Sequence, residues 1–600
     1  MIENKSHIWG LLVILLSVTL VSFNLTKDNL DTYSGTPLFI TDIKASNNYG
    51  IFLSQKGTKS VVLYKPDFSK QLRSWQFDEI PTGIAVSNNM LYVTTFEQRG
   101  MLHVFNLKTN KKVGSIPMGS GATAPTPNSD FSKIYVCNQF SNTVSEVDCK
   151  TNKVTRTVKV LREPRSLAIS KDGKFLFVAN YLPAQQANVD TVASCVSVID
   201  IKKFAKTKDI QLANGSNAVQ SLCLTANGEY LLVVHNLGRF QVPTSQIQQG
   251  WMNTSAMSVV NIANQAFEGA VLLDEPEMGA GGLWGVACTL KEILVTQYGT
   301  HQISVIDLEK FIEKFKNYPD KSSLSYDLNF LYEIRERITL TGNGPRNFIV
   351  YGNKAIIPTY FSDTINILDL ENKTIQAIGL LKNRIETSEQ KGERFFNDAS
   401  FCFQNWQSCS GCHPGEARTD GMNWDLMNDG MGNPKNCKSL LLSHVTPPSM
   451  ISGIRANAEL AVRKGYKLIQ FYDIPEEKAQ CVDNYLRSLK PVPSPYLVNG
   501  KLSTKVIAGK AVYNRIGCNY CHSGEYHTDL QMYRIGKDIE FEKGWDTPTL
   551  SEVWRTAPYL FNGSAATLNE VFTKYKHGIR DSISLKNTEI EELVEYVNSL

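Results

Sequence analysis

The sequence predicts a multidomain chain in which an all-β part made of seven repeats is followed by two mainly α-helical domains. Three observations support this prediction. Short β-rich runs recur between residues 41 and 381, the pattern C-x-x-C-H occurs twice near the C-terminus, and the flanks of its two copies resemble each other. The composition, with 42% hydrophobic and 20% charged residues in 600, is ordinary for a globular protein of several domains. A net charge of +4 is too small to indicate a nucleic acid partner.

Residues 1–30 are predicted to be an export signal or an N-terminal membrane anchor. An apolar run from Ile8 to Val21 follows Lys5, and it is shorter than the ~20 residues of a comfortable transmembrane helix. No clear small-x-small cleavage site follows the run, so an uncleaved tether to the membrane stays open as an alternative to a cleaved signal peptide. Either interpretation places the mature chain outside the cytoplasm, in the periplasm or at the surface of a bacterial cell.

Residues 35–385 are predicted to form a seven-bladed β-propeller. Each repeat contains two apolar runs, the second of which commonly ends in Asp or Asn. After a degenerate first copy at 51–64, the paired runs lie at 91–95 and 102–107, 134–138 and 144–148, 175–180 and 196–200, 231–236 and 258–261, 293–296 and 303–307, and 356–359 and 365–369. Uninterrupted copies are about forty residues long, the length of a four-stranded blade, and a ring of such blades buries the apolar faces of each against its neighbours.

Three of the repeats are lengthened by insertions, at residues 182–194, 238–255 and 308–337, of which the last has a helical pattern. His235 and His301 follow inner-strand runs, where the loops of a propeller funnel emerge. The second insertion also carries a polar and aromatic stretch that ends at Met252. A ligand or partner site in the funnel is one interpretation of these residues, and ordinary hydrogen-bonded loop residues are the other.

The two C-x-x-C-H motifs are predicted to attach two haem c groups covalently. In this motif the thiols add to the vinyl groups of haem, and the histidine binds the iron. The attachment residues would be Cys409, Cys412, Cys518 and Cys521, with His413 and His522 as the proximal iron ligands. A redox dithiol or half of a zinc site could explain a single C-x-x-C. Zinc, however, requires a second close ligand pair, and a thioredoxin-type motif follows a βαβ strand.

The sequences around the two motifs indicate a tandem duplication. Thr446, Pro448 and Gly453 recur with the same spacing as Thr556, Pro558 and Gly563, and both halves close on a helix that ends in Ser-Leu. We therefore expect two mainly α cytochrome c domains, the first at residues 386–492 and the second at residues 493–600.

Eight of the twelve cysteines lie outside the motifs, and most of these are expected to be small buried side chains. Cys437 and Cys481 are the exception, because both lie in the first haem half and neither has a counterpart in the second. An oxidising compartment would favour a disulfide between them.

Two resemblances to known families follow from these motifs. The repeats resemble the YVTN family of β-propellers, because residues 91–95 and 134–138 nearly spell Tyr-Val-Thr-Asn. The C-terminal part resembles the bacterial di-haem cytochrome c peroxidase and MauG family, through the motifs at residues 408–413, 419–421, 518–522, 547–550, 556–559 and 562–563. The second resemblance implies two unlike haems, one that receives electrons and one that meets peroxide. It also implies an aromatic residue between them, for which Trp424 is a candidate.

The chain departs from this family at several positions. Ser551 and Glu552 stand where the family usually has Arg and Asn, and Phe561 stands where it often has His. Three acidic residues are available near the first motif, but their spacing selects none of them as catalytic: Glu416, Asp420 and Glu459. The sequence therefore assigns no catalytic residue.

The family takes the sixth ligand of the second haem from the helix after Asn562 and Gly563, a Met in peroxidases and a Tyr in MauG. Here that segment offers Tyr575 and His577. Register favours Tyr575, whereas chemistry favours His577. A neutral imidazole binds iron without losing a proton, but a phenol must lose its proton to bind well. We predict His577 as the ligand, with Tyr575 as the alternative.

Three functions are compatible with the sequence. The first is a peroxidase-like di-haem oxidoreductase that reduces peroxide or, like MauG, oxidises a protein substrate, with the propeller as a docking platform. The second is an electron-transfer cytochrome whose irons are both blocked by protein ligands. The third is a propeller that binds a partner at the cell surface and whose haems exchange electrons with a respiratory chain. The expected partner is an electron-donor protein or a quinol-linked chain, and the first function is preferred.

Overall fold

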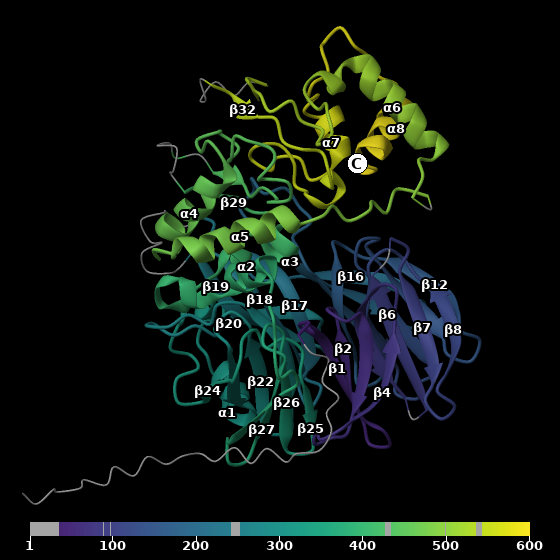
Figure 1. Cartoon of the computed structure of the whole chain (residues 1–600), viewed down its shortest axis with the longest axis vertical. Helices are drawn as coiled ribbons and strands as arrows, with labels where there is room; N and C mark the ends of the chain where they lie inside the picture. The colour runs from purple at the N-terminus through teal and green to yellow at the C-terminus, as the bar shows by residue number, and fades with distance from the viewer. Residues whose placement is uncertain are drawn as a thin grey trace, which may run out of the picture.

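In the computed structural model, seven β-sheets form a ring and the helices of the last third lie over one face of that ring (Figure 1). The structure describes residues 35–600 apart from 88, 97, 242–251, 427–431, 433, 499 and 536–542. The predicted export signal or anchor at residues 1–30 lies outside the described residues. Among the helices of the described part, none combines the length and the apolar character that a bilayer span requires.

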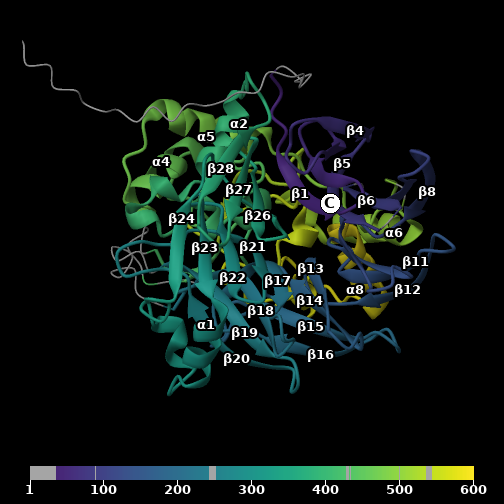
Figure 2. The same ribbon diagram turned by 90° about the horizontal axis from the view of Figure 1, so that it is seen from below.

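The seven-bladed propeller predicted from the repeats is confirmed, and each blade is a four-stranded antiparallel sheet in chain order. The blades are β1–β4 (Ile40–Ser46, Gly50–Gln55, Ser60–Tyr64, Gln71–Gln76), β5–β8 (Ile80–Val86, Met90–Phe96, Met101–Asn106, Lys111–Pro117), β9–β12 (Ala122–Pro127, Lys133–Asn138, Thr143–Asp148, Lys153–Lys159), β13–β16 (Pro164–Ile169, Phe175–Asn180, Cys195–Asp200, Ala205–Gln211), β17–β20 (Ser216–Leu224, Tyr230–Gly238, Asn253–Asn261, Ala266–Leu272), β21–β24 (Leu283–Cys288, Glu292–Gln297, Gln302–Asp307, Arg335–Thr339) and β25–β28 (Ile349–Tyr351, Lys354–Thr359, Thr364–Asp369, Ile375–Gly379). Figure 2 shows fourth strands such as β8, β12 and β16 at the rim and first strands such as β13, β17 and β21 nearer the middle.

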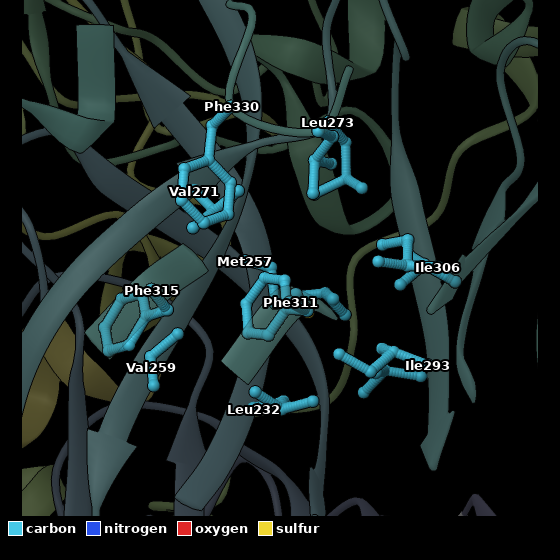
Figure 3. Close-up of a cluster of buried hydrophobic side chains, with 14 of the residues drawn as sticks. Leu232, Met257, Val259, Val271, Leu273, Ile293, Ile306, Phe311, Phe315 and Phe330 are labelled. Carbon is cyan, nitrogen blue, oxygen red and sulfur yellow. The ribbon is translucent and has the colours of Figure 1, made fainter. Parts of the chain in front are cut away.

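The recurring runs of the sequence are the second and third strands of each blade. These strands are buried along most of their length, as in β10 and β11, whereas the fourth strand β12 is mostly exposed. The second and third strands therefore pack between two neighbouring blades, which explains why they are the most apolar and the easiest to recognise. In Figure 3, Leu232, Met257 and Val259 of blade five face Ile293 and Ile306 of blade six.

The last insertion closes the apolar cluster of blades five and six from outside. It begins with helix α1 (Leu308–Lys316), whose Phe311 and Phe315 enter the cluster, and continues with a short 3-10 turn (Ser323–Tyr326). The prediction of a helical insertion up to residue 337 is wrong at its end. Residues from Arg335 onward form β24, because they complete blade six by pairing with β23, with Gln302 opposite Thr339.

The last third folds as two similar helical units. The first contains α2 (Ser388–Asn397), α3 (Pro414–Ala417), α4 (Ala458–Ile469) and α5 (Glu476–Ser488), with β29 (Asn423–Trp424) and β30 (Lys435–Asn436). The second contains α6 (Thr504–Ile516), α7 (Leu568–Thr573) and α8 (Asn587–Asn598), with β31 (Met532–Tyr533) and β32 (Trp545–Asp546). Five short 3-10 turns complete the two units, at Ala399–Phe401, Phe403–Asn405, Cys409–Gly411, Cys518–Tyr520 and Val553–Arg555. Helical content alone does not identify these units as cytochrome c domains.

Equivalent glycines explain how the first and last helices of each unit cross so closely. Helix α2 packs against α5, and α6 packs against α8. A Cβ on Gly392 would lie 1.9 Å from the carbonyl oxygen of Cys481, and a Cβ on Gly509 would lie 1.9 Å from that of Glu592. No larger residue fits at either crossing without moving a helix. The first and last helices therefore pack in the same way in both units.

A buried network of ion pairs joins the propeller to both helical units. Arg555 of the second unit lies 2.9 Å from Glu163 of the propeller and 3.3 Å from Glu552. Glu552 also lies 2.8 Å from Arg418 of the first unit. All four side chains are at most 4% exposed. The propeller is therefore bound to the helical units through a desolvated contact, and the first helix of those units begins at Ser388, close to the predicted boundary at residue 385.

Candidate functional site

The first C-x-x-C-H motif lines an apolar cavity of about 290 Å³. Cys409, Cys412 and His413 all contribute to its wall. The Nδ1 atom of His413 lies 3.3 Å from the carbonyl oxygen of Arg418, so Nδ1–H donates to the backbone and Nε2 is left free. Burial lowers the pKa of His413 to about 4, which keeps its imidazole neutral and able to bind a metal.

All three parts of the chain contribute to this first site. From the propeller, Met252 lines the cavity and the Asn253 amide donates to the Cys412 sulfur at 3.1 Å. The Tyr298 hydroxyl, also of the propeller, is 2.7 Å from that of Ser410, which lies between the two motif cysteines. From the second helical unit, Asp546 reaches the cavity. The first motif is thus held in place by the propeller and is not merely adjacent to it.

The second C-x-x-C-H motif places one imidazole opposite another. His522 Nδ1 lies 3.3 Å from the carbonyl oxygen of His527, which leaves its Nε2 free just as in the first motif. The ring centroids of His522 and His577 are 6.4 Å apart, with the planes tilted by 50°. Two metal–nitrogen bonds of about 2 Å and the half-widths of two imidazole rings add up to roughly 6 Å. This separation would leave room for one metal ion between the two imidazoles.

Burial lowers the pKa of both histidines at the second motif, and that of His522 to about 4 with a further contribution from His577. Both imidazoles are neutral at pH 7 and have a lone pair available. Tyr575, the alternative predicted from register, is directed elsewhere, because its hydroxyl donates to the Ser564 carbonyl oxygen at 2.8 Å. Geometry therefore separates the two candidates and brings His577 towards His522.

The position equivalent to His577 carries a different residue in the first unit. The N-caps of α4 and α7, Asn457 and Thr567, are equivalent. Counting from them, Gly465 and Lys467 stand where the second unit has Tyr575 and His577. A Cβ on Gly465 would meet no atom within 4 Å, and Lys467 pairs at the surface with Asp473 at 3.2 Å. His413 is the sole imidazole among the residues that line the first cavity.

The three acids offered by the sequence do not line the cavity. Glu416 pairs with Lys56 of the propeller at 3.3 Å, and Glu459 pairs with Arg487. Asp420 is buried and accepts a hydrogen bond from the Trp424 indole at 2.8 Å. Burial raises the pKa of Asp420 to about 7, against the hydrogen bonds that it accepts.

Asp546 is the carboxylate that lines the cavity, and sequence reasoning missed it. It is 4% exposed and lies 2.7 Å from Lys438 Nζ. Burial raises the pKa of Asp546 and the charge of Lys438 opposes that shift. Its only signal in the sequence is its place just before the Thr547 to Leu550 motif. Sequence reasoning missed it because Asp546 belongs to the second half of the duplication but lines the site of the first half.

Aromatic residues meet where the two helical units touch. Trp545 stacks on Phe561 with ring centroids 4.3 Å apart and planes 14° apart. The Phe561 carbonyl accepts from the Asn436 amide of the first unit at 2.8 Å. Trp424, the candidate from the family resemblance for an aromatic residue between the haems, lines the first cavity and packs with Met252 of the propeller. Trp545 and Phe561 of the second unit thus form an aromatic pair at its contact with the first unit.

The predicted disulfide between Cys437 and Cys481 is wrong. The Cys437 sulfur lies 3.2 Å from the Cys412 carbonyl oxygen, whereas the Cys481 sulfur is 3.5 Å from the Ser388 hydroxyl. Both cysteines are free. The reason is geometric, since Cys437 follows β30 beside the motif while Cys481 lies where α5 crosses α2.

The two propeller histidines singled out in the sequence are hydrogen-bonded structural residues. His235 is fully buried, with Nε2 2.7 Å from the Ser258 hydroxyl. His301 Nε2 lies 3.2 Å from the Asp398 carboxylate and links blade six to the first helical unit. Across the described part of the chain, no group of three or more His, Cys, Asp or Glu side chains forms a metal site, so a zinc centre built from protein ligands alone finds no support there.

Two of the known proteins that this chain resembles are subunits of one enzyme. No protein-family model matches the sequence. The chain is 25% identical over 271 residues to hydrazine synthase subunit gamma of Kuenenia stuttgartiensis, a match that covers 35% of this chain and 76% of that protein. It is 22% identical over 214 residues to subunit beta of the same enzyme, covering 34% of this chain and 53% of that protein. A solved structure of Kuenenia stuttgartiensis hydrazine synthase matches with a TM-score of 0.50 and 20% identity, over 59% of this chain and 99% of that chain, which concerns the fold alone.

Proposed function

We propose that this chain is an exported haem c oxidoreductase with two covalently attached haems of unequal function, and that it forms part of a hydrazine-producing enzyme. One observation carries the proposal: His413 is the sole imidazole among the described residues that line the first cavity, whereas His577 lies opposite His522 at the second motif. An iron held by His413 would find no second imidazole among the described residues of the cavity, whereas an iron held by His522 would have His577 on its other side. The first site is then the place of chemistry, and the second transfers electrons.

The residues at both motifs fit a haem. The two histidines each donate Nδ1–H to a backbone carbonyl, which orients Nε2 towards a metal. In the first unit the apolar cavity meets both thiols, and Lys438, Arg455 and Lys464 bring positive charge to its wall for the haem carboxylates. When bound, haem supplies an iron that exchanges electrons and, where a position is free, binds a small substrate.

The polar residues of the first cavity support proton transfer. Asp546 is held by Lys438 at 2.7 Å, which fixes its position at the wall of the first cavity. Burial raises its pKa, and a carboxyl group with a raised pKa can hold or release a proton closer to neutral pH than an exposed one. We assign Asp546 the role of holding a proton at its carboxyl oxygen near the first haem.

The similarity to two different subunits of one enzyme supports the choice of reaction class. One way to form the nitrogen–nitrogen bond of hydrazine is to couple ammonium with a nitrogen oxide, a reduction whose electrons haems could deliver and which releases the oxygen as water. We propose that one chain here supplies what subunits beta and gamma supply separately, because the propeller residues Asn253 and Tyr298 bind the first motif directly. The peroxidase-like function predicted from the sequence remains the second candidate, since the same open cavity would admit peroxide.

Haem content is the first prediction. We expect two haems per chain that stay with the polypeptide after acid-acetone extraction, measured by pyridine haemochrome. Replacing Cys409 and Cys412 with alanine should leave one haem, and so should the same change at Cys518 and Cys521. Cys149→Ala, in the propeller, is the matched control and should leave two. A wild-type content of one, or haem that is extracted, would contradict the proposal.

The second prediction tests the unequal haems. The reduced protein should bind one carbon monoxide per chain, because only the first iron has a free position. The Cys409→Ala, Cys412→Ala variant should lose this binding, and the Cys518→Ala, Cys521→Ala variant should keep it. Binding of two molecules or of none in the wild type would overturn the assignment of roles.

The same preparation can separate the two candidate reactions. ¹⁵N-labelled ammonium would be supplied with a panel of nitrogen oxides and a reductant, and labelled hydrazine measured by mass spectrometry after derivatisation. A parallel stopped-flow experiment with hydrogen peroxide would measure peroxide turnover. Hydrazine formation dependent on Cys409 and Cys412 supports the first candidate. Fast peroxide turnover without hydrazine would replace it with the peroxidase-like function.

A further inference from the structure

The first strands of the blades carry a ring of side chains around the propeller axis. Neighbouring first strands contact one another, as β1 with β5 and β13 with β17, so they surround the axis. In blades one to six this strand has a β-bulge near its start, which re-aims the side chain there. The residues at or beside these irregularities, with the equivalent residue of blade seven, are Thr41, Thr82, Thr123, Arg165, Gln220, Trp284 and Arg346.

The two sides of this axial ring differ in chemistry. In blades one and two the threonine hydroxyls are satisfied by the next blade, since Thr41 donates to the Pro81 carbonyl and Thr82 donates to the Ala122 carbonyl. The opposite side carries Arg165 and Arg346. All seven side chains are partly exposed although blades surround them. The axis is therefore not filled by protein at this level.

Among the described residues neither arginine forms an ion pair within 4 Å, although the charge of Arg165 helps to lower the pKa of Glu163. The Arg165 guanidinium lies 3.5 Å from the centre of the Tyr181 ring, and that of Arg346 lies 3.5 Å from the centre of the Tyr360 ring. Stacking of this kind occupies the face of a guanidinium and leaves its N–H edge available. The Nε atoms of both arginines are buried without a hydrogen-bond partner. Elsewhere on the same face, Arg418 and Arg555 are paired with carboxylates.

The two arginines lie beneath the first C-x-x-C-H motif. A Cβ on Gly415, two residues after His413, would be 3.7 Å from Arg165 Nη2. Tyr298, whose hydroxyl is 2.7 Å from that of Ser410, packs edge-on against Trp284 of the axial ring at 5.4 Å. Burial raises the pKa of Tyr298 to about 12, and the charges of Arg346 and Arg165 oppose that shift. Both guanidinium groups therefore act on the same phenol, between the axis and the motif.

We propose that the propeller axis holds a binding site for a small, planar, monovalent oxyanion between Arg165 and Arg346. A buried Nε–H without an acceptor is costly on each arginine, and a guanidinium edge presents paired N–H donors that match the two oxygens of a carboxylate or of nitrite. The Arg165 Nη1 atom is held by Gln220 at 3.2 Å, so its fork is oriented before a ligand arrives. This site is built from propeller side chains and does not depend on the haems.

Calorimetric titration of the full-length, haem-loaded protein with sodium formate at constant ionic strength tests the proposal. We expect one formate per chain. Arg165→Gln and Arg346→Gln should each weaken binding at least tenfold, and the double variant should abolish it. Arg99→Gln, at an exposed site of the propeller, is the control and should bind as the wild type does. No binding in the wild type, or unchanged binding in the double variant, would overturn the proposal.

A second measurement uses the wild-type protein and therefore does not depend on whether a variant folds. Crystals of the wild-type protein soaked in sodium bromide should show an anomalous peak on the axis, within hydrogen-bond distance of Arg165 or Arg346. Peaks confined to other places would overturn the site. The Soret band and the far-UV circular dichroism of the glutamine variants should match the wild type, which would show that loss of formate binding is not loss of fold.

Discussion

Replacing His577 with alanine is expected to convert the second haem from a low-spin to a high-spin ferric centre. His577 is the imidazole opposite His522, at a centroid distance of 6.4 Å. Tyr575 cannot take its place without giving up its 2.8 Å hydrogen bond to the Ser564 carbonyl. A neutral, buried imidazole is a strong axial ligand, and its loss leaves a free or water-filled position. The low-spin signal in low-temperature EPR should therefore disappear from one of the two haems.

The same variant should bind carbon monoxide at both haems, which raises the stoichiometry from one to two per chain. Lys467→Ala is the matched control, because Lys467 occupies the equivalent position in the first unit and pairs with Asp473 at the surface. It should change neither the EPR spectrum nor the stoichiometry. Tyr575→Phe should also leave the low-spin signal in place. A low-spin second haem that survives His577→Ala would show that another residue binds this iron.

The repeats and motifs could be predicted from the sequence because each depends on local pattern. A propeller blade repeats its buried second and third strands, as β10 and β11 show, and such runs are visible without knowledge of the neighbours. Equivalent glycines such as Gly392 and Gly509 likewise leave a local trace, since each helix crossing requires one. These features specify the propeller and the duplicated helical units.

The remaining features depend on contacts between distant parts of the chain. Met252 and Asp546 enter the first cavity from the propeller and from the second unit, and no spacing in the sequence links them to Cys409. The disulfide prediction failed for the same reason, because shared membership of one unit does not bring Cys437 to Cys481. The sequence does not reveal which surfaces of the units meet.

One departure from the resembled family acquires a physical reason in the structure. Glu552 stands where that family usually has Asn, and it is 1% exposed. Its carboxylate accepts from Arg418 and Arg555, which links the two helical units to the propeller through Glu163. Glu552 is therefore explained by the contact with the propeller. It shares Arg555 with Glu163, and a chain without Glu163 would leave Arg555 with one partner fewer.

Arg555→Ala is accordingly expected to cost about 3–5 kcal/mol of unfolding free energy at pH 7, because it leaves Glu163 and Glu552 buried without their shared partner. Urea unfolding of the haem-loaded protein, followed by circular dichroism, would measure the loss. Lys505→Ala is the control, since Lys505 and Glu591 form an exposed pair at 3.6 Å and exposed pairs contribute little. A variant as stable as the wild type would show that the network does not hold the units together.

The effect of Arg555→Ala should also depend on pH in a defined direction. Burial would raise the pKa of Glu163, but the charge and hydrogen bond of Arg555, with smaller contributions from Arg165 and Arg162, outweigh burial and hold the pKa of Glu163 at about 2. Because a glutamate in the unfolded chain titrates near ~4.3, the ionised Glu163 stabilises the wild type above that pH. This contribution is lost as the pH falls from ~4.3 through the folded value. In Arg555→Ala the largest opposing charge is removed and only Arg165 and Arg162 still oppose burial, so protonation of Glu163 costs the folded variant less than it costs the wild type. The difference in unfolding free energy between wild type and variant should therefore be largest at pH 7 and shrink as the pH falls below ~4. A difference that stays constant between pH 7 and pH 3 would mean that lost packing, and not the buried charge of Glu163, accounts for the destabilisation.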